Sequence, residues 1–309
     1  MKTSVIGAGP WGTAVASLLK RNNHDVKLWA YQNILDKDIV PIEGIKVTDD
    51  IVESVKDSEY IFIVLNSQFF IATLDQLNFE ELKDKKFVIL TKGLVHFEDS
   101  YHLSFEILEK KYNISKDNIA VLSGPNIAKE IYNQKPSAAV VASESELNDE
   151  VKNVMSSDNF TVHLSTDMYG VQWCGILKNP VAIGVGILDG LYPNTSNPKS
   201  AFITNALREM QEVGILFNAQ ETTFQSVAGI GDLMTTCLSG RNQKVGLMLA
   251  EGNSLDEIYE LFKPQKPEGS EQIKIIYNLI KEQMEAPIFT LLYQILYEGK
   301  DIKEIKQTI

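Results

Sequence analysis

The motif Gly7-x-Gly9-x-x-Gly12 most restricts the folds open to this chain. It directly follows the apolar run 3–6 and opens the helix-compatible segment 11–20. In such a strand–turn–helix unit the first glycine permits a tight turn, the second lets the backbone approach a pyrophosphate, and the third brings the helix against the strand. The amides at the helix start attract the phosphates. The motif therefore predicts a dinucleotide-binding unit of the Rossmann type, with a strand-to-helix turn that binds no ligand as the alternative.

Further apolar segments follow at the spacing of alternating strands and helices. We expect strands at 25–30, 60–65, 87–90, 119–122 and 138–142. Their continuous apolar character is typical of a parallel sheet buried on both faces. Polar or glycine-bearing turns follow several of them, at 66–68, 91–93 and 123–126. Because the carboxyl-end turns of an open parallel sheet line its ligand crevice, Lys92 is a candidate functional residue, although a solvated turn lysine would look the same.

From about residue 166 the pattern changes to one helix after another. We expect helices at 173–191, 200–217, 243–250, 255–262, 270–283 and 289–297. The sequence therefore predicts an α/β N-terminal domain of the Rossmann type over residues 1–166, followed by an all-α C-terminal substrate domain over residues 167–309. A crevice between the two domains would bring Lys178 opposite the nicotinamide end of a bound dinucleotide.

Lys178 lies in the apolar, glycine-rich segment 173–191 and is the only Lys or Arg between Lys152 and Lys199. If the segment is helical, the ammonium projects from an apolar stripe. Partial loss of hydration would favour the neutral amine, which a proton-transferring lysine needs. The alternative is a core helix whose lysine reaches water along its own aliphatic stem.

The second dense motif is AGIGDLMTTCLSGRN, residues 228–242. Asp232 is a lone acid in an apolar setting and is suited to orienting or charging a nearby lysine by ion pairing. Gly240, Arg241 and Asn242 precede an expected helix, so backbone amides, a guanidinium and a side-chain amide could converge on a phosphate. Both features could instead be structural, with Asp232 capping a turn and Arg241 forming a surface salt bridge.

Charge and cysteine content exclude several classes of protein. The chain of 309 residues has 29 Lys and Arg against 41 Asp and Glu, a net charge of −12, so a generally basic surface for nucleic acid or anionic membrane is not expected. Cys174 and Cys237 are too few for a disulfide framework and lack metal-ligand spacing, which indicates reduced thiols and no metal site. No secretory leader and no uninterrupted apolar run of ~20 residues is present, so we expect a cytoplasmic protein.

The end of the second expected strand leaves the choice between NAD and NADP open. It reads Ala30-Tyr31-Gln32, with no Asp or Glu before Asp36. An acid at this point reads the ribose hydroxyls in NAD enzymes, and an arginine accommodates the 2′-phosphate of NADP. The turn at residues 30–32 has neither an acid nor an arginine.

Ordered sequence blocks resemble the NAD(P)-dependent glycerol-3-phosphate dehydrogenases over nearly the whole length. The blocks are GAGPWGTA (7–14), TKGL (91–94), SGPNIAKE (123–130), GILKN (175–179), AIGVGILDGL (182–191), GIGDLMTTC (229–237), SGRN (239–242) and LYEGK (296–300). The resemblance implies hydride transfer between NAD(P)H and dihydroxyacetone phosphate to give sn-glycerol 3-phosphate, which feeds glycerophospholipid synthesis. It also implies a homodimer.

The same resemblance assigns roles to individual residues. Lys178 matches the general acid/base at the C2 oxygen, with Lys92 and Asp232 completing its polar setting. The positions that match substrate-binding residues are Lys92, Gly124, Asn179, Asp232, Thr236, Gly240, Arg241 and Asn242, of which the last two hold the phosphate. The positions that match cofactor-binding residues are Gly7, Gly9, Pro10, Trp11, Gly12, Lys92, Ala128, Arg241 and Glu268.

Four features depart from the family pattern. Pro180 replaces the usual Val or Ile after the Lys-Asn pair, where an interior proline removes a helix hydrogen bond and can kink the segment. Asn205 replaces an arginine, Asn66 replaces a proline, and the segment 33–48 is short. We expect these changes to affect substrate affinity and loop geometry more than the type of reaction.

Two other functions fit parts of the sequence. One is another β-hydroxyacid-type dehydrogenase with a carboxylate substrate, which the block Gly240-Arg241-Asn242 argues against. The other is a catalytically silent nucleotide-binding regulator, which the intact Lys178 and its polar neighbours argue against.

Overall fold

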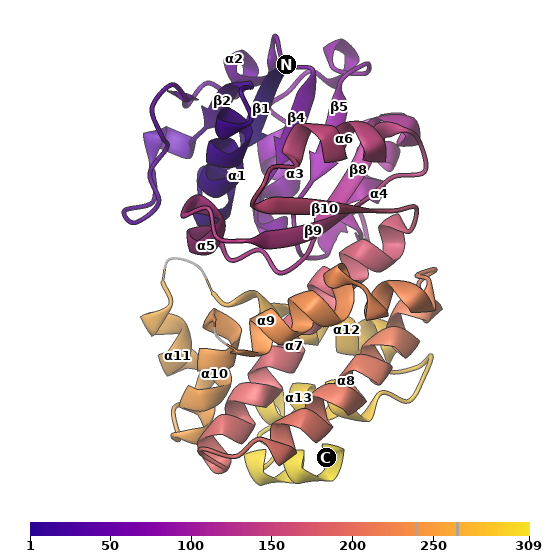
Figure 1. The fold of residues 1–309 in the computed structure, drawn as a ribbon. Coiled ribbons are helices and arrows are strands. Elements are labelled where there is room, and N and C mark those ends of the chain that lie inside the picture. Colours follow the sequence, from indigo (N-terminus) through magenta and orange to yellow (C-terminus); the bar gives the residue numbers. More distant parts are fainter. Residues whose placement is uncertain (239, 264–265) are drawn as a thin grey trace. The chain divides into compact units, whose positions relative to one another are not determined.

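The structure, a computed structural model, describes residues 1–238, 240–263 and 266–309, so Ser239 of the SGRN block lies outside the described residues. The chain forms two compact units, Met1–Gln172 and Trp173–Ile309 (Figure 1). The change from one unit to the other falls inside helix α7 (Met168–Leu191), whereas the sequence pattern places a boundary just before this helix.

The first unit is built on an eight-stranded sheet with the order β10-β9-β8-β5-β4-β1-β2-β3. The strands are β1 (Lys2–Ile6), β2 (Asp25–Trp29), β3 (Lys46–Thr48), β4 (Tyr60–Ile63), β5 (Lys86–Ile89), β8 (Ile119–Ser123), β9 (Ser137–Ala142) and β10 (Phe160–Ser165). The central strands are buried along their whole length, as their apolar sequences predict. The strands expected from the sequence, and the Rossmann-type architecture, are confirmed.

The sheet is mixed, not wholly parallel as the sequence pattern suggests. β9 runs antiparallel to β8, with Val121 opposite Ala142, and β10 runs parallel to β9. The connection from β8 to β9, residues 124–136, contains only the five-residue helix α5 (Ala128–Tyr132), which spans about 7.5 Å. Parallel strands are usually joined by a longer crossover helix that runs back along the sheet. Apolar periodicity identifies a buried strand but does not encode its direction.

Four strands were not expected from the sequence. β10 is an edge strand of six residues that alternate at first between buried and exposed, so it lacks the continuous apolar run of the central strands. The other three have three residues each: β6 (Val95–Phe97) pairs with β7 (Ser100–His102) in a separate hairpin, and β3 lies at the other edge of the sheet. Segments of three residues carry too few apolar positions to be recognised by periodicity.

Helices cover both faces of this sheet. α1 (Pro10–Arg21), α5 and α6 (Leu147–Met155) share one hydrophobic cluster with the strands, in which Leu18, Phe62 and Val151 are buried. Figure 1 shows α1 and α6 in front of the strands, and α3 and α4 behind them. The helices outside this cluster are α2 (Ile51–Val55), α3 (Phe70–Leu74) and α4 (Ser104–Lys110).

Helices joined by turns and loops, without strands, make up the described residues of the second unit, which confirms the all-α prediction. Its helices are α7, α8 (Asn197–Leu216), α9 (Asp232–Leu238), α10 (Arg241–Ala250), α11 (Leu255–Leu261), α12 (Glu268–Ile280) and α13 (Pro287–Tyr297). The sequence pattern predicts neither α9 nor the π-helical turn before it, Val227–Gly231, in which two glycines lower the helix propensity. Pro180 lies inside α7 without ending it.

α7 is the core helix of this unit. Its window of highest hydropathy averages 1.3, enough by length and composition to cross a membrane, but 83% of that window is buried within the protein, as in the core helix of a soluble protein. At Gly186 an added Cβ would lie 1.9 Å from the backbone oxygen of Gln243, and at Gly246 it would lie 1.9 Å from that of Ile183. The backbones of α7 and α10 are therefore in direct contact.

Glu209 of α8 is a buried carboxyl group that caps another helix. Its side chain accepts hydrogen bonds from the first amides of α13, those of Ile288 at 2.9 Å and Phe289 at 2.7 Å. Burial raises the pKa of Glu209 from 4.5 to about 7, although the two amide hydrogen bonds act in the opposite direction. The residue is only 4% exposed. Its charged form is therefore disfavoured in the folded protein.

Glu209 is expected to make stability fall with rising pH. Because its folded pKa of about 7 exceeds the unfolded value of 4.5, its stabilisation is present in full below pH 4.5 and is lost as the pH rises to about 7. The loss amounts to ~3 kcal/mol. Urea denaturation of wild type and Glu209→Gln from pH 4.5 to 8 checks this. The unfolding free energy of wild type should fall relative to that of Glu209→Gln over that range, and a constant difference would contradict the assignment.

Candidate active site

Two glycines of the Gly-rich turn are required by the backbone, and the third leaves open space. Gly7 has φ +114°, which side chains rarely adopt, and an added Cβ at Gly12 would lie 1.8 Å from the Gly7 oxygen. By contrast, an added Cβ at Gly9 would meet no atom within 4 Å. Gly7 and Gly12 therefore fix the approach of α1 to β1, and the open flank of Gly9 leaves room for a ligand.

The start of α1 carries donors suited to a phosphate. Pro10 is its first residue, and Gly9 caps the helix without a side-chain hydrogen bond. The Nε1 of Trp11 is buried and has no hydrogen-bond partner among the described residues. Unpaired amides at a helix start favour anions. The open space at Gly9 and these donors fit the pyrophosphate of a dinucleotide.

Lys92 and Gly124 lie together at the carboxyl ends of neighbouring strands of this unit. Lys92 follows β5, and its Nζ donates to the backbone oxygen of Gly124, which follows β8, at 3.3 Å. Gly124 has φ +154°, and an added Cβ would lie 2.9 Å from the oxygen of Ala138. Ala128 is the first residue of α5, a few positions further along. This edge also carries the Gly-rich turn after β1, because β1, β4, β5 and β8 are parallel.

In the second unit, Lys178 and Asp232 form a buried ion pair. Lys178 lies in the middle of α7 and is 6% exposed, and Asp232 begins α9 and is 1% exposed. Burying two charges is costly, and replacing such a pair with apolar residues is often neutral or stabilising. A buried ion pair of this kind is therefore weak evidence for a role in stability, and it marks a candidate functional site.

Cys237 lies close enough to the Lys178–Asp232 pair for the charge of Lys178 to act on its thiol, but the thiol is not activated. Burial raises the pKa of its thiol to about 12, although the charge of Lys178 acts in the opposite direction. The thiolate is the reactive form of cysteine, so Cys237 remains a protonated, unreactive thiol near neutral pH. Cys237 is therefore a poor candidate for proton transfer or nucleophilic chemistry in this unit.

A chain of side-chain amides joins three helices next to Lys178. Asn242, in the first turn of α10, donates from Nδ2 to Oδ1 of Asn179 at 3.0 Å. Asn179 donates from Nδ2 to the oxygen of Gly175 at 3.3 Å and to Oε2 of Glu268, at the start of α12, at 3.4 Å. The start of α10 is thereby held beside the residue that follows Lys178.

Other predicted residues lie on the same two helices. Thr236 of α9 donates its hydroxyl to the backbone oxygen of Asp232 at 2.7 Å. Gly240 has φ +135° and precedes Arg241, the first residue of α10, whose side chain is exposed. The second unit thus brings Lys178, Asn179, Asp232, Asn242 and Glu268 together through hydrogen bonds and ion pairs.

Two departures from the family pattern have structural roles. Asn205 of α8 donates from Nδ2 to the backbone oxygen of Thr308 at 3.0 Å, so it anchors the end of the chain. Asn66, after β4, accepts the amide hydrogen of Gln68 at 3.1 Å and caps a short turn. Neither contact could be deduced from residue type alone.

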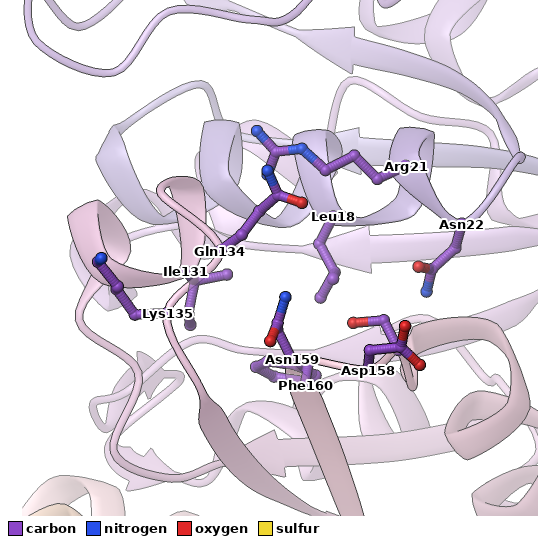
Figure 2. A pocket seen from close by; sticks show the side chains of 10 residues that line it. Leu18, Arg21, Asn22, Ile131, Gln134, Lys135, Asp158, Asn159 and Phe160 are labelled. Atoms are coloured by element: carbon purple, nitrogen blue, oxygen red, sulfur yellow. The ribbon is translucent and has the colours of Figure 1, made fainter.

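A cavity of about 170 Å³ in the first unit contains none of the predicted site residues. Buried Leu18, Ile131 and Phe160 contribute its apolar lining, and the side chain of Arg21 lies at its margin beside Gln134 (Figure 2). In the described residues 1–238, 240–263 and 266–309, no group of three or more His, Cys, Asp or Glu side chains could hold a metal ion.

A Rossmann-type unit joined to a helical unit with a buried lysine–carboxylate pair defines the class of NAD(P)-dependent dehydrogenases. Family models narrow the class. The model of the NAD-dependent glycerol-3-phosphate dehydrogenase N-terminus matches residues 2–149, and that of its C-terminus matches residues 167–307. The chain belongs to the NAD-dependent glycerol-3-phosphate dehydrogenase family.

Individual relatives agree over the whole chain. A glycerol-3-phosphate dehydrogenase [NAD(P)+] of Thermoanaerobacter sp. is 36% identical, over 97% of this chain and 94% of that protein. The crystal structure of glycerol-3-phosphate dehydrogenase from Coxiella burnetii matches with a TM-score of 0.88 and 29% identity, over 99% of this chain and 97% of that one. The yeast enzyme from Saccharomyces cerevisiae matches with a TM-score of 0.86 and 26% identity, over 100% and 99% of the two chains.

Proposed function

We propose that this protein interconverts dihydroxyacetone phosphate and sn-glycerol 3-phosphate with NAD(H) or NADP(H). The observation that carries the proposal is the buried Lys178–Asp232 pair in the same unit as the glycine-preceded start of α10. The pair suits proton transfer at a carbonyl oxygen, and the start of α10 offers Arg241 and backbone amides to a phosphate. Names of relatives over nearly the full chain support the same reaction.

In the proposed mechanism the chain holds the substrate and moves one proton. Lys178 donates a proton to the C2 oxygen of the ketone during reduction and removes it during oxidation. Asp232 orients the ammonium and stabilises its charge, and Lys92 adds a second positive charge to the polar setting. The nicotinamide cofactor, when bound, supplies the hydride in reduction and accepts it in oxidation.

The remaining site residues are proposed to bind the substrate or the cofactor. Arg241, Asn242 and the amide after Gly240 hold the substrate phosphate, and Asn179, Thr236 and Gly124 complete the substrate site. The cofactor-binding residues are proposed to be Gly7, Gly9, Pro10, Trp11, Gly12, Lys92, Ala128, Arg241 and Glu268. The unpaired Nε1 of Trp11 and the open space at Gly9 support this assignment in the first unit.

One assay tests the proposal. Purified protein is mixed with NADH or NADPH and dihydroxyacetone phosphate, and the absorbance of the reduced nicotinamide is followed. We expect its decrease to require the ketone and the protein together. The proposal fails if 2-oxo carboxylates are reduced and the phosphorylated ketone is not, or if cofactor binds and no ketone is reduced.

Both cofactors are expected to support reduction, with unequal efficiency. The end of β2 leads into Ala30, Tyr31 and Gln32, which offer neither an acid for the ribose nor an arginine for the 2′-phosphate. Gln32 lies at φ 51° and donates to the hydroxyl of Tyr31 at 3.3 Å, so the turn presents uncharged groups. Comparing kcat/KM for NADH and NADPH checks this. A preference beyond ~10⁴-fold, or more than ~5.5 kcal/mol, would mean that another element reads the ribose.

We further propose a cytoplasmic homodimer whose product feeds glycerophospholipid synthesis. The family resemblance supports this context, and the reaction is proposed to run in both directions. Light scattering after size exclusion should give about twice the 34.6 kDa mass of one chain. A mass near that of one chain would refute the dimer without affecting the proposed reaction.

A further inference from the structure

We propose that Gly269 is a positioning residue of this site. Its amide group sets the orientation of Asn242 and Asn179, and its missing side chain lets α12 press against α7 at the residue next to Lys178. The inference rests on the proposed function for its effect on catalysis, but the hydrogen-bond order that it describes can be measured without any substrate.

The order of hydrogen bonds starts from a group whose polarity is fixed. The backbone N–H of Gly269 can only donate, and it lies 2.9 Å from Oδ1 of Asn242. The Nδ2 of Asn242 must therefore point the other way, where it donates to Oδ1 of Asn179 at 3.0 Å. This leaves Nδ2 of Asn179 facing Gly175 and Glu268, whose backbone oxygen and carboxylate are both acceptors. One backbone amide thus determines which way both side chains point.

The position next to this amide has no room for a side chain. An added Cβ at Gly269 would lie 2.6 Å from the backbone oxygen of Asn179, 2.8 Å from its carbonyl carbon and 2.9 Å from Oδ1 of Asn242. The first two atoms belong to the backbone of α7 and cannot rotate away. Gly269 is itself buried. A methyl group here must push α12 away from α7 at Asn179, beside Lys178.

The network also changes the role expected of Asn179. Its two amide hydrogens are engaged by Gly175 and Glu268, and its oxygen by Asn242. A substrate would have to displace Gly175 or Glu268 to receive a hydrogen bond from this amide, whereas the oxygen keeps a second lone pair that can accept one. We therefore infer that Asn179, besides its proposed contact with the substrate, holds α7, α10 and α12 together, so that Arg241 and Lys178 keep a fixed separation.

Gly269→Ala is expected to lower kcat for dihydroxyacetone phosphate by ~30-fold or more, because displacements near 1 Å at a reacting group cost about 10²-fold. The primary deuterium isotope effect, measured with reduced nicotinamide cofactor deuterated at C4, separates misplacement of the substrate from partial unfolding. Partial unfolding would lower kcat and leave the isotope effect unchanged. A misplaced substrate slows the chemical step, so the isotope effect should increase.

Gly190→Ala is the matched control. An added Cβ there would lie 2.3 Å from the Cβ of Ala250, a comparable overlap between α7 and α10 at the far end of α7. We expect this variant to lose thermal stability and to keep the wild-type kcat and isotope effect. Equal loss of kcat in both variants, or near-wild-type kcat in Gly269→Ala, would overturn the positioning role.

Amide hydrogen exchange tests the hydrogen-bond order whether or not the protein reduces this ketone. In Asn242→Ala the amide of Gly269 should exchange ~10-fold faster or more, since it loses its acceptor. In Asn242→Asp a carboxylate can still accept from Gly269, so protection should be kept, while donation to Asn179 is lost. Unchanged exchange at Gly269 in Asn242→Ala would refute the inference, whereas an inactive wild type would refute only the proposed function.

Discussion

Lys178→Met is expected to lower the turnover of dihydroxyacetone phosphate by ~10²–10⁴-fold, the usual cost of losing a general acid/base. Methionine keeps the length and apolar body of the lysine side chain but can neither give nor accept the proton. Loss of the positive charge near the developing alkoxide adds to the effect. Fluorescence titration with NADH should give a nearly unchanged dissociation constant, because Lys178 is not among the proposed cofactor-binding residues.

The control for Lys178→Met must also neutralise Asp232, whose buried negative charge the single variant leaves unbalanced. Lys178→Met alone leaves Asp232 buried without its partner, and such a charge costs about 3–5 kcal/mol of stability. The double variant Lys178→Met/Asp232→Asn should recover much of that stability and remain inactive. Near-wild-type turnover in either protein would exclude Lys178 from the mechanism.

Arg241→Ala is expected to lower kcat/KM for dihydroxyacetone phosphate by about 10³-fold, since truncating one partner of a hydrogen-bonded charge pair costs 2–5 kcal/mol. On a protein of net charge −12, a dianionic substrate needs a local group of donors. Arg241→Lys keeps the charge but loses the planar guanidinium that binds two phosphate oxygens, so it should still lose at least ~10-fold. Steady-state kinetics of the three proteins check both values.

Unphosphorylated dihydroxyacetone separates the phosphate contact from other effects. It should be a poor substrate for every variant, and its turnover should change little when Arg241 is replaced. Arg208→Ala is a suitable control, because that side chain is 81% exposed and pairs only with a neighbour on its own helix in the described structure. An equal loss toward both ketones would mean that Arg241 acts through the cofactor or the fold.

The sequence predicts those parts of the fold whose causes are local. The Gly-rich turn could be recognised because positive φ at Gly7 and contact at Gly12 both demand glycine within six residues. The direction of β9 could not be predicted, since the same apolar run suits a buried strand of either direction. α9 could not be predicted because it has only seven residues between flanking glycines, too few for a clear helical period.

The candidate site divides in the same way. The sequence identified Lys178 as unusual and Asp232 as a suitable partner, and the two residues form an ion pair although 54 positions separate them. The link from Asn179 to Glu268 spans 89 positions, and no property of an asparagine indicates which distant group it will face. The sequence does not single out Gly269, because a glycine near a helix start has several ordinary structural explanations.

The backbone contact between α7 and α10 restricts which substitutions this sequence can accept during evolution. A larger residue at Gly186 or Gly246 would meet main-chain atoms, which no second substitution can make smaller. A clash between two side chains can be relieved by a second substitution that makes one of them smaller. A clash with main-chain atoms cannot be relieved in this way. Compensating pairs of mutations are therefore closed off at these two positions, and a search for stabilised variants of this enzyme gains nothing by sampling them.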